Sequence, residues 1–125
     1  MTFPENCKYT ETHEWVRVDG DTAIIGVTDF AQGELGDVVF IDIPEMRTVA
    51  KGESFGSIEA VKTVSDIIAP IAGTITEINA ALEGTPELVN SDPYGEGWMV
   101  KMTITDPADL DNLMDVAAYS ALIGK

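Results

Sequence analysis

The sequence predicts a small, mainly β domain that ends in a helical segment. Short stretches rich in valine, isoleucine and threonine alternate with glycine and proline along most of the chain, which is typical of all-β domains. Apolar residues recur at helical spacing only near the C-terminus. The chain has 125 residues, of which 45% are hydrophobic. This length suits one domain with its own core, so we expect a single domain over residues 1–125.

The first third of the chain predicts a hairpin, a short helix and a strand. Residues 15–18 and 22–27 have strand composition, and the turn residues 19–21 between them indicate a loop of about three residues. Thr28 is a suitable N-cap for a single helical turn that stops at Gly33 or Gly36. A strand over residues 38–43 follows.

The middle of the chain predicts a tight hairpin. Strands over residues 54–59 and 64–68 flank a tip near Lys62, and a turn over 69–73 leads to a third strand over 74–78. We expect these three strands to form a meander. A lysine at a hairpin tip projects clear of both sheet faces, where a modifying enzyme can reach its amine. A simple solvated turn lysine would show the same local pattern.

The last part predicts one more strand and the helical segment. Residues 98–104 form the strand, and Asp106 followed by Pro107 is a helix start. Apolar residues then recur at helical spacing to residue 122. We expect a C-terminal helix over about 106–123, either as one helix or as two short ones broken near Asp115.

Charge and composition exclude several classes of function. Seven basic residues stand against 22 acidic ones, which gives a net charge of −15. Such a chain repels phosphate backbones and anionic lipid, so we expect no nucleic-acid or membrane partner. The start of the chain lacks the features of a signal or transit peptide, and no apolar run approaches about 20 residues. These features predict a soluble, cytosolic protein, or a processed organellar one.

Catalytic and metal-binding patterns are weak. His13 is the only histidine and Cys7 the only cysteine, and the sequence has neither a nucleophile motif nor the spacing of a calcium loop. Paired carboxylates cannot be inferred from the abundance of acids alone. We therefore expect no catalytic residue and no metal site.

Four stretches of the sequence resemble one protein family in the same order. Residues 56–73, GSIEAVKTVSDIIAPIAG, resemble the lipoyl-lysine hairpin of glycine cleavage system H proteins. Residues 9–15, 26–40 and 90–99 resemble three other segments of that family. Two departures are small: Ala60 replaces a common serine, and residues 46–48 replace a commoner glycine-containing turn.

This resemblance implies the fold more closely. It indicates a flattened barrel-sandwich hybrid of the lipoyl/biotinyl type, with the lipoyl lysine, Lys62, at a hairpin tip. The short helix in the N-terminal half and the C-terminal helical segment belong to the same fold. Biotin carriers share the hairpin, but they usually place methionine on both sides of their lysine, where this chain has Val61 and Thr63.

The resemblance also implies a function in glycine catabolism and one-carbon metabolism. Lipoic acid would be joined to Lys62 through an amide, and the chain would be a monomeric, non-catalytic carrier of an aminomethyl group. It would move from the pyridoxal-phosphate decarboxylase (P protein) to the aminomethyltransferase (T protein), and dihydrolipoyl dehydrogenase (L protein) would reoxidise it. An H-like protein that relays lipoate to other lipoyl-dependent complexes is the alternative.

Three carboxylates receive roles from the same resemblance. Glu14 and Asp66 are expected to line a cleft that holds the loaded, cationic arm by charge-assisted hydrogen bonds. Glu59 and Asp66 are expected to help lipoylating enzymes recognise the hairpin.

Overall fold

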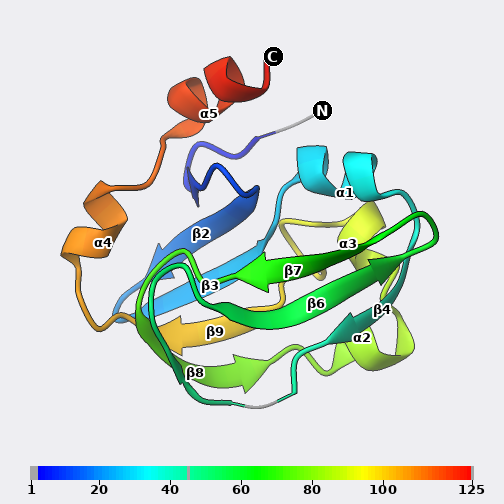
Figure 1. Cartoon of the computed structure of the whole chain (residues 1–125). Coiled ribbons are helices and arrows are strands. Elements are labelled where there is room, and N and C mark those ends of the chain that lie inside the picture. Colours follow the sequence, from blue (N-terminus) through cyan, green and yellow to red (C-terminus); the bar gives the residue numbers. More distant parts are fainter. Residues whose placement is uncertain (1–2, 45, 125) are drawn as a thin grey trace.

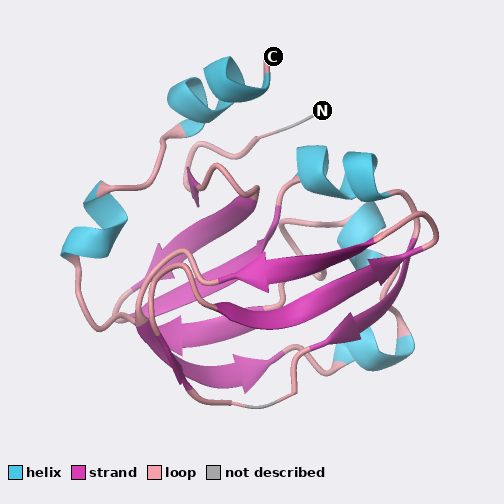
Figure 2. Ribbon diagram, in the orientation of Figure 1, coloured by secondary structure: helices cyan, strands magenta, loops and turns pink. Residues whose placement is uncertain are grey.

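The chain forms two stacked β-sheets with short helices around them (Figures 1 and 2). The structure, a computed structural model, describes residues 3–44 and 46–124. The larger sheet has the order β1-β2-β3-β9-β8-β5 and the smaller one the order β4-β6-β7. The predicted mainly β fold is confirmed. The strands of the larger sheet are β1 (Lys8–Tyr9), β2 (Glu14–Asp19), β3 (Thr22–Val27), β9 (Val100–Thr103), β8 (Gly73–Ile78) and β5 (Thr48–Val49).

The smaller sheet contains the predicted lysine hairpin. Its strands are β4 (Val38–Asp42), β6 (Ser54–Ala60) and β7 (Val64–Ile68), all antiparallel. In the view of Figure 1 this sheet lies in front of the larger one. Apolar side chains from both sheets meet between them and form the main core, which includes Ile25, Ile58, Ile67 and Met102.

The predicted meander is wrong, because β8 leaves the sheet that contains β7. It pairs with β9 and β5 in the larger sheet instead. Proline has no N–H for a strand ladder, so buried Pro70 cannot continue β7, and the turn around it crosses the core to the other sheet. At the end of this crossing Gly73 lies so close to β9 that an added Cβ would be 1.9 Å from the Thr103 carbonyl oxygen.

The β2–β3 hairpin is tighter than the sequence predicted. Asp19 and Thr22 pair directly, so only Gly20 and Asp21 form the loop. Gly20 has a φ of +63°, a conformation that residues with a side chain rarely adopt. This glycine explains why a loop of two residues suffices where about three were expected.

The predicted short helix is two turns long. In α1 (Asp29–Leu35) the Thr28 Oγ1 accepts the Ala31 N–H at 3.1 Å, and the helix ends at Gly36, the later of the two expected stops. Two further short helices, α2 (Ala81–Gly84) and α3 (Leu88–Ser91), lie in a stretch that gave no helical signal.

The C-terminal segment forms two short helices with a break that includes Asp115, so the two-helix alternative is confirmed and one continuous helix over 106–123 is wrong. These are α4 (Ala108–Asp111) and α5 (Val116–Ile123). The break lies where Met114 exchanges two backbone hydrogen bonds with Tyr9 of β1, each 2.8 Å long. Asp115 then starts α5 by accepting the Ala118 N–H at 2.8 Å. Along the described parts of the chain, no helix has both the length and the apolar character needed to cross a membrane.

Candidate functional site: the lysine hairpin and an adjoining cleft

The turn that joins β6 and β7 lies at one end of the smaller sheet (Figure 1), and Lys62 is exposed in this turn. The Ala60 N–H donates to the Thr63 carbonyl at 2.8 Å, which leaves only Val61 and Lys62 in the turn. The Val61 N–H in turn donates to the Asp37 carbonyl at 3.0 Å. The hairpin tip is therefore held against the segment that precedes β4.

The side chain of Lys62 rests beside Gly36. A Cβ added at Gly36 would lie 3.4 Å from Lys62 Cε and 3.5 Å from Cδ, and the φ of Gly36 is +80°. The glycine thus leaves room for the aliphatic part of the lysine at a backbone position that other residues rarely adopt.

Asn90 of α3 braces the segment on which the tip rests. Its Oδ1 accepts the Val38 N–H at 2.8 Å, and its Nδ2 donates to the Gly36 carbonyl at 2.8 Å and to Gln32 Oε1 at 3.0 Å. One side chain therefore joins α1, the start of β4 and α3. Sequence reasoning missed this residue, and its only signal was that it opens the stretch 90–99 that resembles the family.

Glu59 and Asp66 both lie exposed on the outer face of the smaller sheet. Glu59 is three residues before Lys62 and pairs with Val64, and Asp66 is four residues after Lys62 and pairs with Ser57. These positions leave both carboxylates in solvent near the turn.

Glu14 lies elsewhere, buried at the start of β2 with an exposed fraction of 2%. Thr10 Oγ1 donates to its Oε1 at 2.9 Å, and Thr12 Oγ1 donates to the same oxygen. Burial raises the pKa of Glu14 to about 7, although both hydroxyls and the backbone of Ile68 favour the charged form. Glu14 is therefore buried away from solvent, whereas Asp66 is exposed to it.

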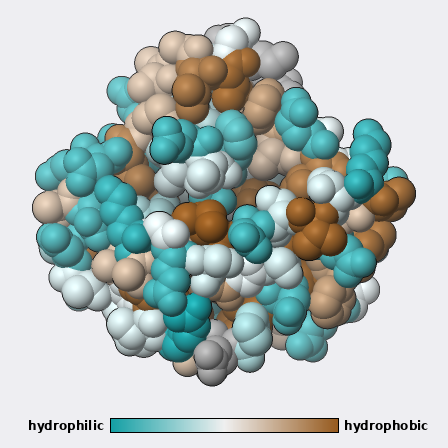
Figure 3. All heavy atoms as spheres, viewed as in Figure 1, coloured by the Kyte–Doolittle hydropathy of each residue, from teal (hydrophilic) through white to brown (hydrophobic). Residues whose placement is uncertain are grey.

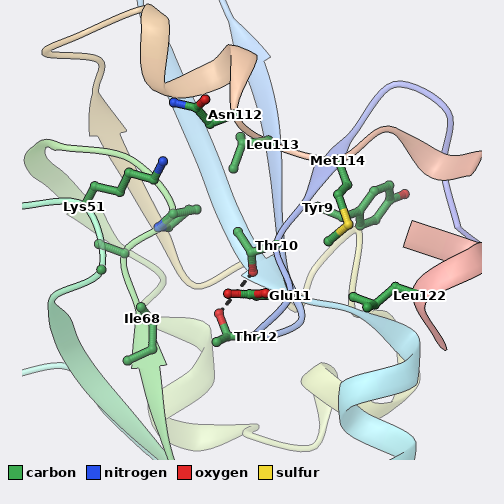
Figure 4. Close-up of a pocket in the computed structure, with 13 residues that line it drawn as sticks. Tyr9, Thr10, Glu11, Thr12, Lys51, Ile68, Asn112, Leu113, Met114 and Leu122 are labelled. Atoms are coloured by element: carbon green, nitrogen blue, oxygen red, sulfur yellow. Dashed lines mark hydrogen bonds between the residues drawn. The ribbon is translucent and has the colours of Figure 1, made fainter. Parts of the chain in front are cut away.

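A cavity of about 490 Å³ lies directly beside the hydroxyls that bind Glu14 (Figure 4). Thr10 and Thr12 line it, and Ile68 brings the end of β7 to it. In Figure 4, Lys51 lies on the wall opposite Met114 and Leu122. Neither Glu14 nor Asp66 is among the lining residues, and the carboxylate of Glu14 lies behind the two threonines that are. The sequence analysis missed Thr10, Glu11, Thr12 and Lys51 as lining residues.

The outer face of β7 connects the turn to this cavity. Side chains alternate between the two faces of a strand, so Val64, Asp66 and Ile68 share one face. Val64 stands beside the lysine turn and Ile68 lines the cavity, with Asp66 halfway. A group attached to Lys62 and laid along this face would therefore pass Asp66 before it reached Thr10 and Thr12.

A second hollow adjoins the cavity and shares Glu11, Thr12 and Leu122 with it. His13 and Phe30 line it together with Leu122. His13 Nδ1 is 2.8 Å from the Tyr119 hydroxyl, and burial lowers the pKa of this histidine. Over residues 3–44 and 46–124, no group of three or more histidine, cysteine or acidic residues could hold a metal ion.

Comparison with known proteins agrees with this geometry. A family model described as "Glycine cleavage H-protein" matches residues 7–125. The chain belongs to the glycine cleavage H-protein family. A glycine cleavage system H protein from Bacteroides fragilis is 57% identical over 124 residues, which are 98% of each chain. One from Thermus thermophilus is 52% identical over 98% of this chain and 97% of that relative.

A solved H-protein structure has the same fold. The crystal structure of a glycine cleavage system H protein from Mycobacterium marinum superposes with a TM-score of 0.90 and is 38% identical. The match covers 98% of this chain and all of that one. The two-sheet fold with C-terminal helices is therefore that of the H-protein family.

Proposed function

We propose that this chain is the lipoyl carrier of the glycine cleavage system and that Lys62 is its attachment site. As a member of the H-protein family, the chain is a carrier component of that system. The observation that carries the residue assignment is the exposed two-residue turn at Lys62, inside the hairpin sequence that resembles the family. Lys62 is exposed at this turn, so a lipoylating enzyme can reach its amine.

The structure offers residues that fit a lipoyl group on Lys62. The lysine amine would form an amide with the lipoyl carboxylate, which takes the formal charge from −15 to −16 because one cation is lost. When bound, the group supplies a dithiolane that can carry an aminomethyl group and two electrons. Glu59 and Asp66, exposed on either side of the turn, suit recognition by the lipoylating enzyme.

The cavity beside Glu14 suits the amine end of the loaded arm. The hydroxyl oxygens of Thr10 and Thr12 can each accept a hydrogen bond from an ammonium group while they donate to Glu14. A cation there favours the charged carboxylate of Glu14, and Asp66 provides a second negative charge along the way. The walls from the C-terminal segment limit access of water to the arm, which protects a labile group between visits to enzymes.

The remaining parts of the proposal follow from the carrier role. The partners are the P, T and L proteins, together with lipoylating enzymes. The chain itself holds and presents the arm and catalyses no step, and its residues 1–125 work as one monomeric carrier domain. Its site of action is the cytoplasm of a bacterial cell, or the mitochondrial matrix if the chain is a processed eukaryotic one.

Intact-mass analysis tests the attachment site. Protein from lipoate-fed cells should gain one lipoyl group, and Lys62→Arg should gain none while its circular dichroism spectrum and melting temperature stay unchanged. The same variant should support no glycine decarboxylation with the partner enzymes. Acylation of Lys51 or Lys101 in place of Lys62 would contradict the assignment.

Release of the aminomethyl group tests the cleft. Loss of this group from loaded carrier should be faster in Glu14→Gln than in the native chain, since the charge behind the threonines is gone. Glu83→Gln, an exposed change in α2, is the matched control. Equal release rates in Glu14→Gln and the control would remove the protective role of the cleft.

A further inference from the structure

Apolar side chains gather around the lysine turn. Seven large hydrophobic residues among those described are exposed, and four of them, Val39, Phe40, Val61 and Val64, lie at this end of the smaller sheet with exposed fractions of 50% to 71%. Figure 3, in the same view as Figure 1, shows hydrophobic residues near the end of the β6–β7 hairpin with hydrophilic residues between them. We call these four residues the tip patch.

The strand register places Phe40 and Val64 of the tip patch on the outer face of the smaller sheet. Phe40 pairs with Glu59, and Glu59 pairs with Val64, so the three side chains form one row across β4, β6 and β7. Directly paired side chains in such a row are about 5 Å apart. An irregularity in the pairing between Val38 and Phe40 leaves Val39 exposed as well. The bulge therefore enlarges the apolar surface beside Lys62.

Acidic residues surround the tip patch. Four exposed acidic residues share this end or face of the smaller sheet, and we call them the acidic rim: Asp37, Asp42, Glu59 and Asp66. Among the cations of the described segments, Arg47 and Lys51 lie at the opposite end of the hairpin, since Arg47 donates to the Ser54 carbonyl and the Gly52 N–H to that of Ala69. Acylation of Lys62 would leave the patch with negative charge only.

We infer that the tip patch is the docking surface for the glycine-decarboxylating enzyme, at an opening lined by apolar residues and ringed by lysine and arginine. This inference rests on the proposed carrier function and adds to it the surface that the enzyme contacts. The occupant is a basic surface and not a second copy of this chain, because two copies would bring their acidic rims together. The four apolar side chains of the tip patch give contact area, and the acidic residues among and around them steer the encounter.

Matched valine-to-threonine changes test the apolar part. Val64→Thr and the double change Val39→Thr/Val64→Thr remove a methyl group from the patch and keep a β-branched side chain. Val18→Thr makes the same change at an exposed position of β2, outside the patch. All variants are purified with Lys62 lipoylated, as checked by intact mass, and their melting temperatures are compared.

The readout is the KM of the decarboxylase for each carrier in glycine–CO2 exchange. We expect an approximately fourfold rise in KM for Val64→Thr and about tenfold or more for the double change, with kcat unchanged. Val18→Thr should behave as the native chain. An equal KM for Val64→Thr and Val18→Thr would overturn the docking surface.

The acidic rim has its own test. Asp37→Asn/Asp42→Asn should weaken the rise of KM with ionic strength, whereas Asp19→Asn/Asp21→Asn in the β2–β3 turn should leave it unchanged. The same slope in both double variants would count against the rim. If the lipoylated native chain supports no glycine–CO2 exchange at all, the proposed function is wrong. If it supports normal exchange and the variants do not change KM or its dependence on ionic strength, only the docking surface is wrong.

Discussion

Replacing Glu14 by glutamine should change how stability depends on pH. Glu14 has a pKa near 4.5 when solvated and about 7 in the folded chain. The folded chain therefore binds more protons than the unfolded chain between these values. The stability that this gives is fully present below pH 4.5 and is lost as the pH rises through about 7.

The size of the effect follows from the two pKa values. A pKa shift of one unit corresponds to about 1.4 kcal/mol, so the full contribution of Glu14 to the free energy of unfolding is about 3 kcal/mol. Between about pH 5 and pH 8 most of it should appear, about 2 to 3 kcal/mol. Glutamine does not titrate, and the other acidic residues are common to both proteins, so their contributions to the pH dependence of stability nearly cancel. The difference between native chain and variant thus isolates Glu14.

Urea unfolding followed by circular dichroism measures this difference. The free energy of unfolding of the native chain minus that of Glu14→Gln should fall by about 2 to 3 kcal/mol from about pH 5 to about pH 8. Glu83→Gln, an exposed change in α2, is the matched control. Parallel pH profiles for the native chain and Glu14→Gln would refute the view that Glu14 is buried without a compensating cation.

Two further substitutions test hydrogen bonds that stabilise the fold, one made by Asn90 and one by Tyr119. Asn90→Ala leaves the Val38 N–H and the Gly36 carbonyl without their partner, so urea unfolding should show a loss of about 2 to 3 kcal/mol, and enzymatic lipoylation of Lys62, followed by mass, should slow. The exposed Asn112→Ala is its control, and equal stability of the two would contradict the bracing role. Tyr119→Phe removes hydrogen bonds of 2.8 Å to His13 and 2.7 Å to Thr28, which should cost about 1 to 2 kcal/mol in thermal or urea unfolding; a stability equal to the native chain would show that these bonds add nothing.

Local sequence patterns predicted most of the fold because each depends on neighbouring residues. The cap at Thr28, the stop at Gly36 and the hairpin around Lys62 are all decided within a few positions, and the structure contains each of them. The pairing of β8 was missed because it depends on where the chain goes after Pro70. Strand alternation is the same whether a strand pairs with its predecessor or crosses the core, so only the packed structure distinguishes the two.

The candidate site divides in the same way. Lys62, Glu59 and Asp66 belong to one hairpin, so sequence could place them together. The cavity joins segments far apart in the chain, such as Thr10, Lys51 and Met114, and no local pattern records that they meet. The burial of Glu14 could not be predicted from the sequence either, because no local pattern distinguishes it from the other acidic residues among the 22.

The lysine turn and the cavity lie at opposite ends of the smaller sheet, and different elements support each end. The braces at the turn end come from α1 and α3, through Asn90. The cavity end takes part of its wall from Leu113, Met114 and Leu122, which the Tyr9–Met114 backbone bonds hold in place. In the proposed function, presentation of Lys62 for acylation relies on the two sheets together with α1 and α3, whereas shelter of a loaded arm relies on the C-terminal segment. Two contacts join that segment to the loop that carries Thr10 and Thr12, and so to the carboxylate of Glu14: the backbone bonds between Tyr9 and Met114, and the hydrogen bond between His13 and Tyr119.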